Sequence, residues 1–143
     1  MPKIELQLFA DYFQFYLQDD DPKFGDLSEA WTQEAVDNLL AESDHVIGIG
    51  TVRNMDVPVF IEILETLPQL KPDDWDRINY SSISCGTGRL VIAGCTDYFP
   101  DAKRIHLTPG DYDLTVGYKD LDKISEDGLD GEDSYHLFLY PKV

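Results

Sequence analysis

Residues 45–64 read HVIGIGTVRNMDVPVFIEIL, a pattern that indicates a β fold. Two runs rich in β-branched and apolar residues, 45–52 and 57–64, flank the polar tetrapeptide 53–56. Runs of this length and composition are typical of β-strands, and four polar residues between them suit a hairpin connection. The stretch therefore predicts two consecutive strands joined by a hairpin.

Strand patterns recur along the rest of the chain. Apolar residues alternate with polar ones in 4–8 and again in 12–18, where both faces of the strand are expected to be partly covered. One helix is predicted at 33–42, with Thr32 as its N-cap and an apolar stripe that must dock on the sheet. Further strands are predicted at 78–85, 89–95, 104–107, 112–118 and 135–140. Eight or nine strands with one short helix predict a single mainly β domain over 1–143, an antiparallel, Greek-key-like β-sandwich.

Two turns carry further information. The hexapeptide LTPGDY at 107–112 has the form of a tyrosine corner, in which the Tyr112 hydroxyl bonds to upstream backbone as the chain crosses between sheets. The turn 86–88 is expected to close a second hairpin. In that hairpin Cys85 and Cys95 lie too far apart along the ladder for a disulfide, so both are expected to be buried free thiols.

The net charge restricts the class of partner. The chain has 28 acidic and 11 basic residues, a formal net charge of −17 and a pI of about 4.2. Such a surface repels nucleic acid and anionic membranes, and it attracts basic proteins. A hydrophobic content of 43% is too high for a disordered tail, so the charge coats a folded core. Apolar runs fall below the ~18 residues of a membrane span and no signal peptide is recognisable, so a cytoplasmic location is expected.

Much of the acid lies in two segments. One is DDD at 19–21, and the other is DLDKISEDGLDGED at 120–133, with seven acids and one lysine. Both could contact a basic partner, although solvated loops would have the same composition. Arg53 is a further candidate. Its side chain could pair with an acidic loop or reach a partner, or Arg53 could be a simple turn residue. The predicted partner-binding residues are Asp19, Asp20, Asp21, Arg53, Asp120, Asp122, Glu126, Asp127, Asp130, Glu132 and Asp133.

Calcium binding is the alternative interpretation of the same acids. Asp127, Asp130, Glu132 and Asp133 offer oxygen ligands with an interposed glycine, but they lack the spacing of an EF-hand. No G-x-S-x-G motif or Walker loop is present, and no histidine has a metal-ligand partner at helical or strand spacing. We therefore expect a binding protein without catalytic residues or cofactor, and a calcium- or small-ligand-binding sandwich is the alternative.

Several stretches, in the same order along the chain, resemble the competence protein J family. They are YFQF at 12–15 leading into 18–19, WTQEAV at 31–36, RN at 53–54 and LTPGDYDLT at 107–115. The resemblance covers roughly residues 10–118 and implies a small cytosolic protein that binds and inhibits a DNA-entry nuclease, without enzymatic activity of its own. The acidic C-terminal segment and the stretch CGTGRLVIAGCTDY at 85–98 depart from the family.

Overall fold

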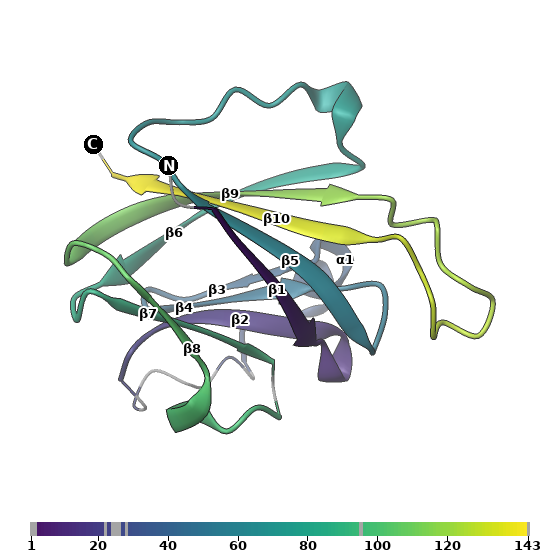
Figure 1. Cartoon of the computed structure of the whole chain (residues 1–143), viewed down its shortest axis with the longest axis horizontal. Helices are drawn as coiled ribbons and strands as arrows, with labels where there is room; N and C mark the ends of the chain where they lie inside the picture. The colour runs from purple at the N-terminus through teal and green to yellow at the C-terminus, as the bar shows by residue number, and fades with distance from the viewer. Residues whose placement is uncertain (1–2, 22, 24–26, 28, 95, 143) are drawn as a thin grey trace.

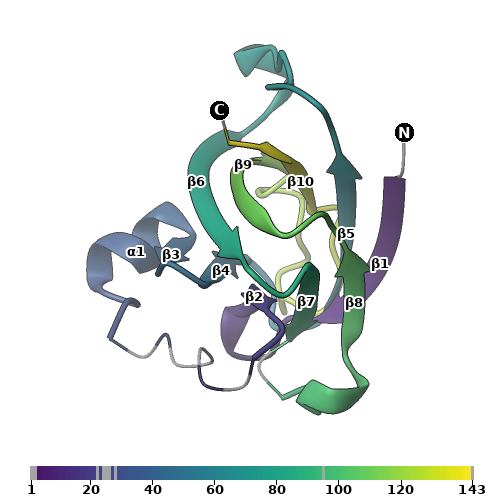
Figure 2. The same cartoon turned by 90° about the vertical axis from the view of Figure 1, so that its left-hand side faces the viewer.

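Two five-stranded sheets face each other across a single core (Figures 1 and 2). The computed structural model describes residues 3–21, 23, 27, 29–94 and 96–142. The first sheet has the order β1 (Lys3–Phe9), β5 (Asp56–Ile63), β10 (Ser134–Pro141), β9 (Gly110–Lys119) and β6 (Arg77–Cys85). The second has the order β3 (Leu40–Glu42), β4 (Val46–Gly50), β2 (Gln14–Asp19), β7 (Arg89–Gly94) and β8 (Lys103–His106).

The predicted mainly β sandwich is confirmed, with two differences in detail. Ten strands rather than eight or nine occur in the described residues. All strand pairs are antiparallel except β5 with β10, which run parallel. One α-helix, α1 (Gln33–Asn38), precedes β3, and short 3-10 turns lie at Asp11–Phe13, Pro72–Asp74 and Phe99–Asp101. No helix among the described residues is long and apolar enough to cross a membrane.

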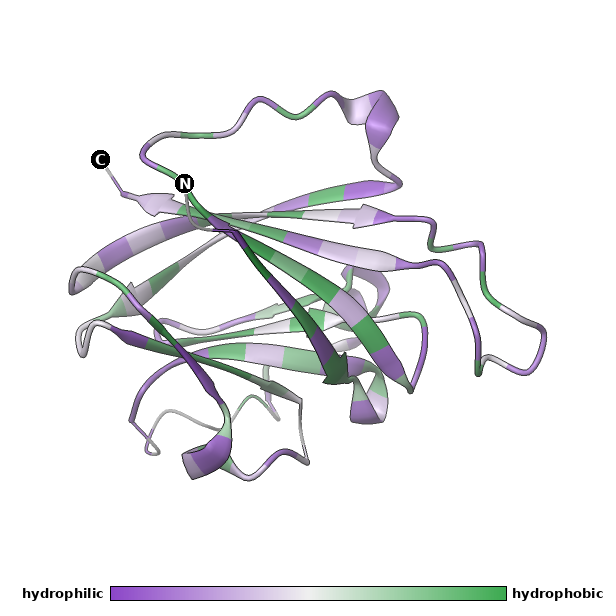
Figure 3. Ribbon diagram, in the orientation of Figure 1, coloured by the Kyte–Doolittle hydropathy of each residue, from purple (hydrophilic) through white to green (hydrophobic). Residues whose placement is uncertain are grey.

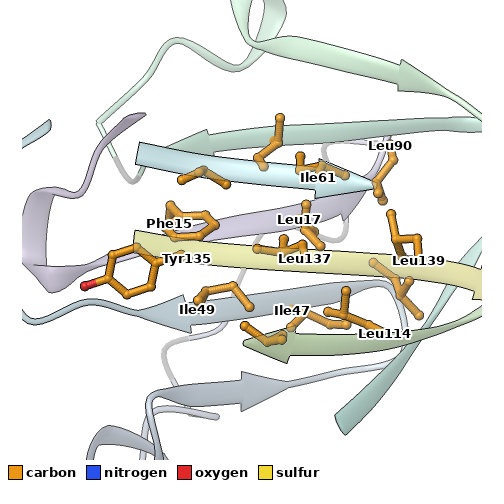
Figure 4. Close-up of a cluster of buried hydrophobic side chains, with 14 of the residues drawn as sticks. Phe15, Leu17, Ile47, Ile49, Ile61, Leu90, Leu114, Tyr135, Leu137 and Leu139 are labelled. Carbon is orange, nitrogen blue, oxygen red and sulfur yellow. The ribbon is translucent and has the colours of Figure 1, made fainter. Parts of the chain in front are cut away.

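The core forms where the inward faces of the two sheets meet. Along β10, Tyr135, Leu137 and Leu139 are buried, and the residues between them point outward. Figure 4 shows these side chains packed against Phe15 and Leu17 of the opposite sheet. Hydrophobic and hydrophilic bands accordingly alternate along strands such as β1 and β5 in Figure 3. The sequence therefore alternates with a period of two because each strand buries one of its two faces.

Strand β4 is buried on both faces. Its sequence VIGIG contains no exposed residue, because Trp31 and Leu27 cover the outer side at Gly48. A Cβ atom on Gly48 would lie 2.7 Å from the Trp31 ring, so only glycine admits this close approach. Trp31 therefore acts as a cover over the second sheet.

Both predicted hairpins are wrong in the same way. The chain passes from β4 in the second sheet to β5 in the first, and from β6 in the first to β7 in the second. Each connection, 51–55 or 86–88, is short, because a few residues suffice to span the ~10 Å between two packed sheets. The turn at 86–88 uses Gly88 with φ of 74°, in the left-handed region that favours glycine. Cys85 is a buried free thiol, as expected, and Cys95 lies outside the described residues.

The helix begins where predicted and ends early. Thr32 is the N-cap, and its Oγ1 accepts a hydrogen bond from Ala35 N at 3.2 Å. The predicted end at residue 42 is wrong, because Leu39 adopts a left-handed conformation and the chain continues as β3. The expected docking of an apolar stripe is only partly met: Leu40 lies in the core and Leu39 packs against it, but both follow the helix, and Val36 within α1 is 50% exposed. The apolar side chain of Val36 therefore remains at the surface.

The tyrosine corner forms as predicted. The Tyr112 hydroxyl donates a 2.7 Å hydrogen bond to the carbonyl oxygen of Thr108. This bond fixes the entry into β9, the strand that leads to the acidic segment 120–133.

Candidate functional site

The two acidic segments lie at opposite ends of the sandwich (Figure 1). Asp19 bonds to Gly86, next to Cys85, which pairs with Gly110 at the start of β9. The segment 120–133 follows the other end of β9, which is 10 residues long. At ~3.3 Å per residue, about 30 Å separates the two segments. They therefore do not form one continuous surface.

Asp19, in the first segment, is buried and saturated with hydrogen bonds. Its side chain accepts bonds from Gly86 N (3.0 Å), Thr87 N (3.2 Å) and Thr87 Oγ1 (2.7 Å), and the residue is 2% exposed. Burial alone raises the pKa of Asp19, but the bonds from Thr87 and Gly86 and the nearby His45 together hold it below its usual value. Asp19 thus braces the crossover at 86–88 from inside the protein.

Asp20 and Asp21 also have cationic neighbours. Asp20 pairs with Arg89 (2.9 Å) and Arg104 (3.1 Å), and the hydrogen bond from Arg104 is the largest cause of its lowered pKa. Asp21 lies 3.5 Å from Lys23. The charge of the first segment is therefore largely compensated within the chain.

Arg53 pairs with the second acidic segment, one of the three roles considered from the sequence. Its Nε donates to Asp133 Oδ1 at 2.6 Å, and its Nη1 donates to the Leu129 carbonyl oxygen at 3.3 Å. The Tyr135 hydroxyl donates to the second oxygen of Asp133 at 2.7 Å. Arg53 is 6% and Asp133 0% exposed, so neither side chain is available to a partner in this structure. Together they clamp the base of the segment to the β4–β5 connection.

The rest of the second segment projects into solvent beyond the clamp (Figure 1). It is folded on itself by a bridge between Ile124 and Gly131 and by a 2.7 Å bond from Ser125 N to Asp130 O. Lys123, its one base, pairs with the half-buried Asp120 at 3.2 Å. Five acidic residues of the segment are exposed and form no salt bridge among the described residues: Asp122, Glu126, Asp127, Asp130 and Glu132. We call these five residues, with Asp120, the acidic loop.

The carboxylates proposed for calcium do not gather at one point. Asp133 binds Arg53 and Tyr135, whereas Asp127 accepts bonds from the Ser125 hydroxyl and Leu129 N. Across the described ranges, no three His, Cys, Asp or Glu side chains are grouped to hold a metal ion. The geometry offers no support for the calcium alternative.

An apolar pocket opens beside the clamp. It has a volume of about 460 Å³ and is lined by residues of the 11–13 turn, by Trp31, by Val36 and Leu39 around α1, and by the end of β4. Thr51 joins the pocket to the clamp, because its N–H donates to the Phe13 carbonyl oxygen and its hydroxyl to that of Arg53. The pocket and the acidic loop thus share one end of the sandwich.

Sequence reasoning missed this pocket. The sequence predicts that the apolar stripe of 33–42, which contains Val36 and Leu39, docks on the sheet, because apolar residues at helical spacing are usually buried. One signal was available. Three of the four stretches that resemble the competence protein J family, 12–15, 31–36 and 53–54, meet at this end of the sandwich.

Cys85 is not a nucleophile in this environment. Burial, followed by the charge of Asp19, raises its thiol pKa to about 11, so the thiol stays protonated near neutral pH. Asp19 Oδ1 lies 3.8 Å from the Cys85 sulfur. The pair therefore does not resemble an activated catalytic dyad.

The fold is shared with two solved structures, although no protein-family model and no curated protein matches the chain. ComJ from Bacillus subtilis, an inhibitor of the DNA degrading activity of NucA, superposes with a TM-score of 0.65. The alignment covers 99% of this chain and 96% of ComJ at 20% identity. The crocagin biosynthetic gene J product aligns over 99% of this chain and 96% of its own, with a TM-score of 0.61 and 16% identity. The chain therefore has the ComJ-like fold that its sequence predicted.

Proposed function

We propose that this chain is a nuclease inhibitor, which binds a basic DNA-degrading enzyme and blocks the cleft that holds DNA. One observation carries the proposal: five exposed acids that form no salt bridge within the described residues gather on the acidic loop, whereas the other acidic segment, 19–21, is compensated internally. ComJ, which has the same fold, is an inhibitor of the DNA degrading activity of NucA.

The fold by itself does not assign the function. One fold supports different functions, and the second structure with this architecture is the product of a crocagin biosynthetic gene. The argument therefore depends on the surface. A nuclease binds DNA phosphates with lysine and arginine, and a loop of carboxylates offers the same sign of charge to the same cleft.

Electrostatic attraction would act before contact. A net charge of −17 steers a basic enzyme toward the protein and raises the association rate, most strongly at low ionic strength. At 0.15 M salt the interaction is screened over about 8 Å, so only charges at the interface continue to contribute.

Absence of enzymatic activity and a cytoplasmic location belong to this proposal, and the buried free thiol of Cys85 is consistent with a reducing compartment.

The test is a plasmid-cleavage assay with the purified nucleases of the source organism, beginning with any encoded beside this gene. An equimolar amount of the protein should suppress cleavage by at least one of them. Full cleavage by every nuclease at about tenfold molar excess of the protein would overturn the proposal, since a charge-steered complex is expected to be tight at these concentrations.

The role of the acidic loop requires a charge-matched comparison. One variant replaces four of its acids with the corresponding amides, and a control variant replaces four exposed acids on other elements. The loop variant carries changes at Asp122, Glu126, Asp130 and Glu132, and the control at Glu5, Glu42, Asp44 and Asp101. We expect the loop variant to associate about tenfold more slowly at low salt and the control to change by less than about twofold. Equal effects would show that only total charge matters.

A further inference from the structure

We propose that the apolar pocket beside the acidic loop receives an apolar side chain of the partner, flanked there by lysine or arginine. The inference rests on the proposed function and adds the anchor that the acidic loop alone does not provide. Charged rims mainly govern association rate and specificity, whereas buried apolar anchors at the centre of an interface supply most of the affinity.

The pocket has the size and lining of a binding site. Its volume of about 460 Å³ lies within the ~300–1,000 Å³ range of pockets that enclose small ligands. Tyr12, Phe13 and Val36 at its edge are 68%, 53% and 50% exposed. The indole N–H of Trp31, in its wall, is buried and has no acceptor among the described residues. Apolar surface gathered in this way is typical of an interface.

The backbone holds the two aromatic rings outward at an energetic cost. Tyr12 and Phe13 have φ of 60° and 59°, in the left-handed region that is unfavourable for residues other than glycine. The Asp11 carboxylate accepts a 3.0 Å bond from Tyr12 N, and Asn54 Oδ1 accepts a 3.4 Å bond from Phe13 N. Neither ring is buried in the core, so core packing does not account for this conformation. Strain of this kind is concentrated at functional sites.

Charge around the pocket selects the kind of partner. Residues 27–52, which supply most of the lining, contain five acidic residues and no lysine or arginine. Glu34 and Asp37 on α1 are exposed. Arg77 reaches only the end of the helix, where it donates to Asn38. An apolar side chain between cationic residues fits this surface, and one between acidic residues does not.

A second copy of the chain is the competing occupant of the pocket. The acidic residues of 27–52 around the pocket would then face another molecule of net charge −17, and the two copies would repel each other. The charge therefore favours a basic partner.

Three amidated peptides test the pocket without any nuclease: Lys-Lys-Leu-Lys-Lys, Lys-Lys-Ser-Lys-Lys and Glu-Glu-Leu-Glu-Glu. Binding is followed by NMR through the Trp31 indole N–H and the Gly50 and Thr51 amides, which lie at the pocket. We expect the leucine peptide with lysines to bind about tenfold more tightly than the serine peptide, and the glutamate peptide not to bind. Equal binding of the first two would overturn the inference.

Variants in the nuclease complex separate this inference from the proposed function. Phe13→Ser and Val36→Ser alter exposed side chains at the pocket, and Tyr98→Ser is the control, 71% exposed and close to the opposite edge of the same sheet. We expect the pocket variants to dissociate at least about tenfold faster and the control to be unchanged.

If inhibition occurs and dissociation is unchanged, the pocket inference fails alone. If no nuclease is inhibited but the peptides bind as expected, the proposed function fails alone. If the chain forms a dimer in sedimentation and Val36→Ser abolishes that dimer, the pocket is occupied by a second copy of the chain. That result would overturn the inference that a basic partner occupies it.

Discussion

Replacing Arg53 with methionine should lower the free energy of unfolding by about 3–5 kcal/mol, because it leaves the carboxylate of Asp133 buried without its counter-ion. The Asp133 side chain is 0% and that of Arg53 7% exposed, so water does not take over the lost interaction. After the change, the Tyr135 hydroxyl at 2.7 Å is the one remaining side-chain partner of the Asp133 carboxylate among the residues that the structure describes. An exposed pair would contribute only about 0–1 kcal/mol, so the size of the effect distinguishes a buried clamp from a surface contact.

Urea unfolding followed by tryptophan fluorescence measures this loss. With a slope of ~2 kcal/mol per molar urea, the midpoint should fall by roughly 2 M. Arg89→Met is the control, since Arg89 is half exposed in its pair with Asp20 and should cost less than about 1 kcal/mol. The double change Arg53→Met with Asp133→Leu should recover much of the loss, because no buried charge then lacks its partner. A loss below about 1 kcal/mol for Arg53→Met, or strict additivity in the double variant, would refute the reasoning.

Three further predictions concern the scaffold. Tyr112→Phe removes the bond to Thr108 and should cost about 1 kcal/mol in urea unfolding, whereas no change would mean that the corner does not brace β9. Burial, then the charges of Lys119 and Lys3, lowers the pKa of His136 to about 4, so the unfolded chain binds more protons between about pH 6.5 and 4. Stability should be full above pH 6.5 and fall by about 1–2 kcal/mol over that interval, after discounting for partial exposure, and His136→Phe should remove this slope. Gly117→Ala should lower the melting temperature, because the added Cβ would lie 2.5 Å from the Trp75 ring; an unchanged melting temperature would show that this ring moves freely.

Local pattern predicted the elements well, because burial on one face imposes a period of two on each strand. It did not predict how the elements connect. The stretch 45–64 has the same alternation whether its two strands pair in one sheet or face each other in two sheets. The sequence pattern therefore did not distinguish a hairpin from a crossover, and the predicted hairpin is wrong. The early end of α1 depends on the left-handed conformation of Leu39, for which a leucine gives no signal. The tyrosine corner was predictable because its donor and acceptor are only four residues apart.

The candidate site was predictable in composition and not in arrangement. Asp19 bonds to Thr87 across 68 positions, and Arg53 bonds to Asp133 across 80. A count of charges in the sequence does not distinguish the buried carboxylates of Asp19 and Asp133 from the exposed carboxylate of Glu126. Only the folded chain separates internal carboxylates from surface ones. The same holds for the pocket, whose walls come from segments that the fold brings together.

Hydrogen exchange of this chain, alone and with a nuclease that it is proposed to inhibit, locates the contact surface. We expect slower amide exchange in the acidic loop, in the 11–13 turn and in α1, because these segments share the proposed contact end. Amides at 19–21 and 86–89, at the other end of the sandwich, should exchange at unchanged rates. Protection concentrated at 19–21 and 86–89, or spread evenly over both ends, would contradict the account.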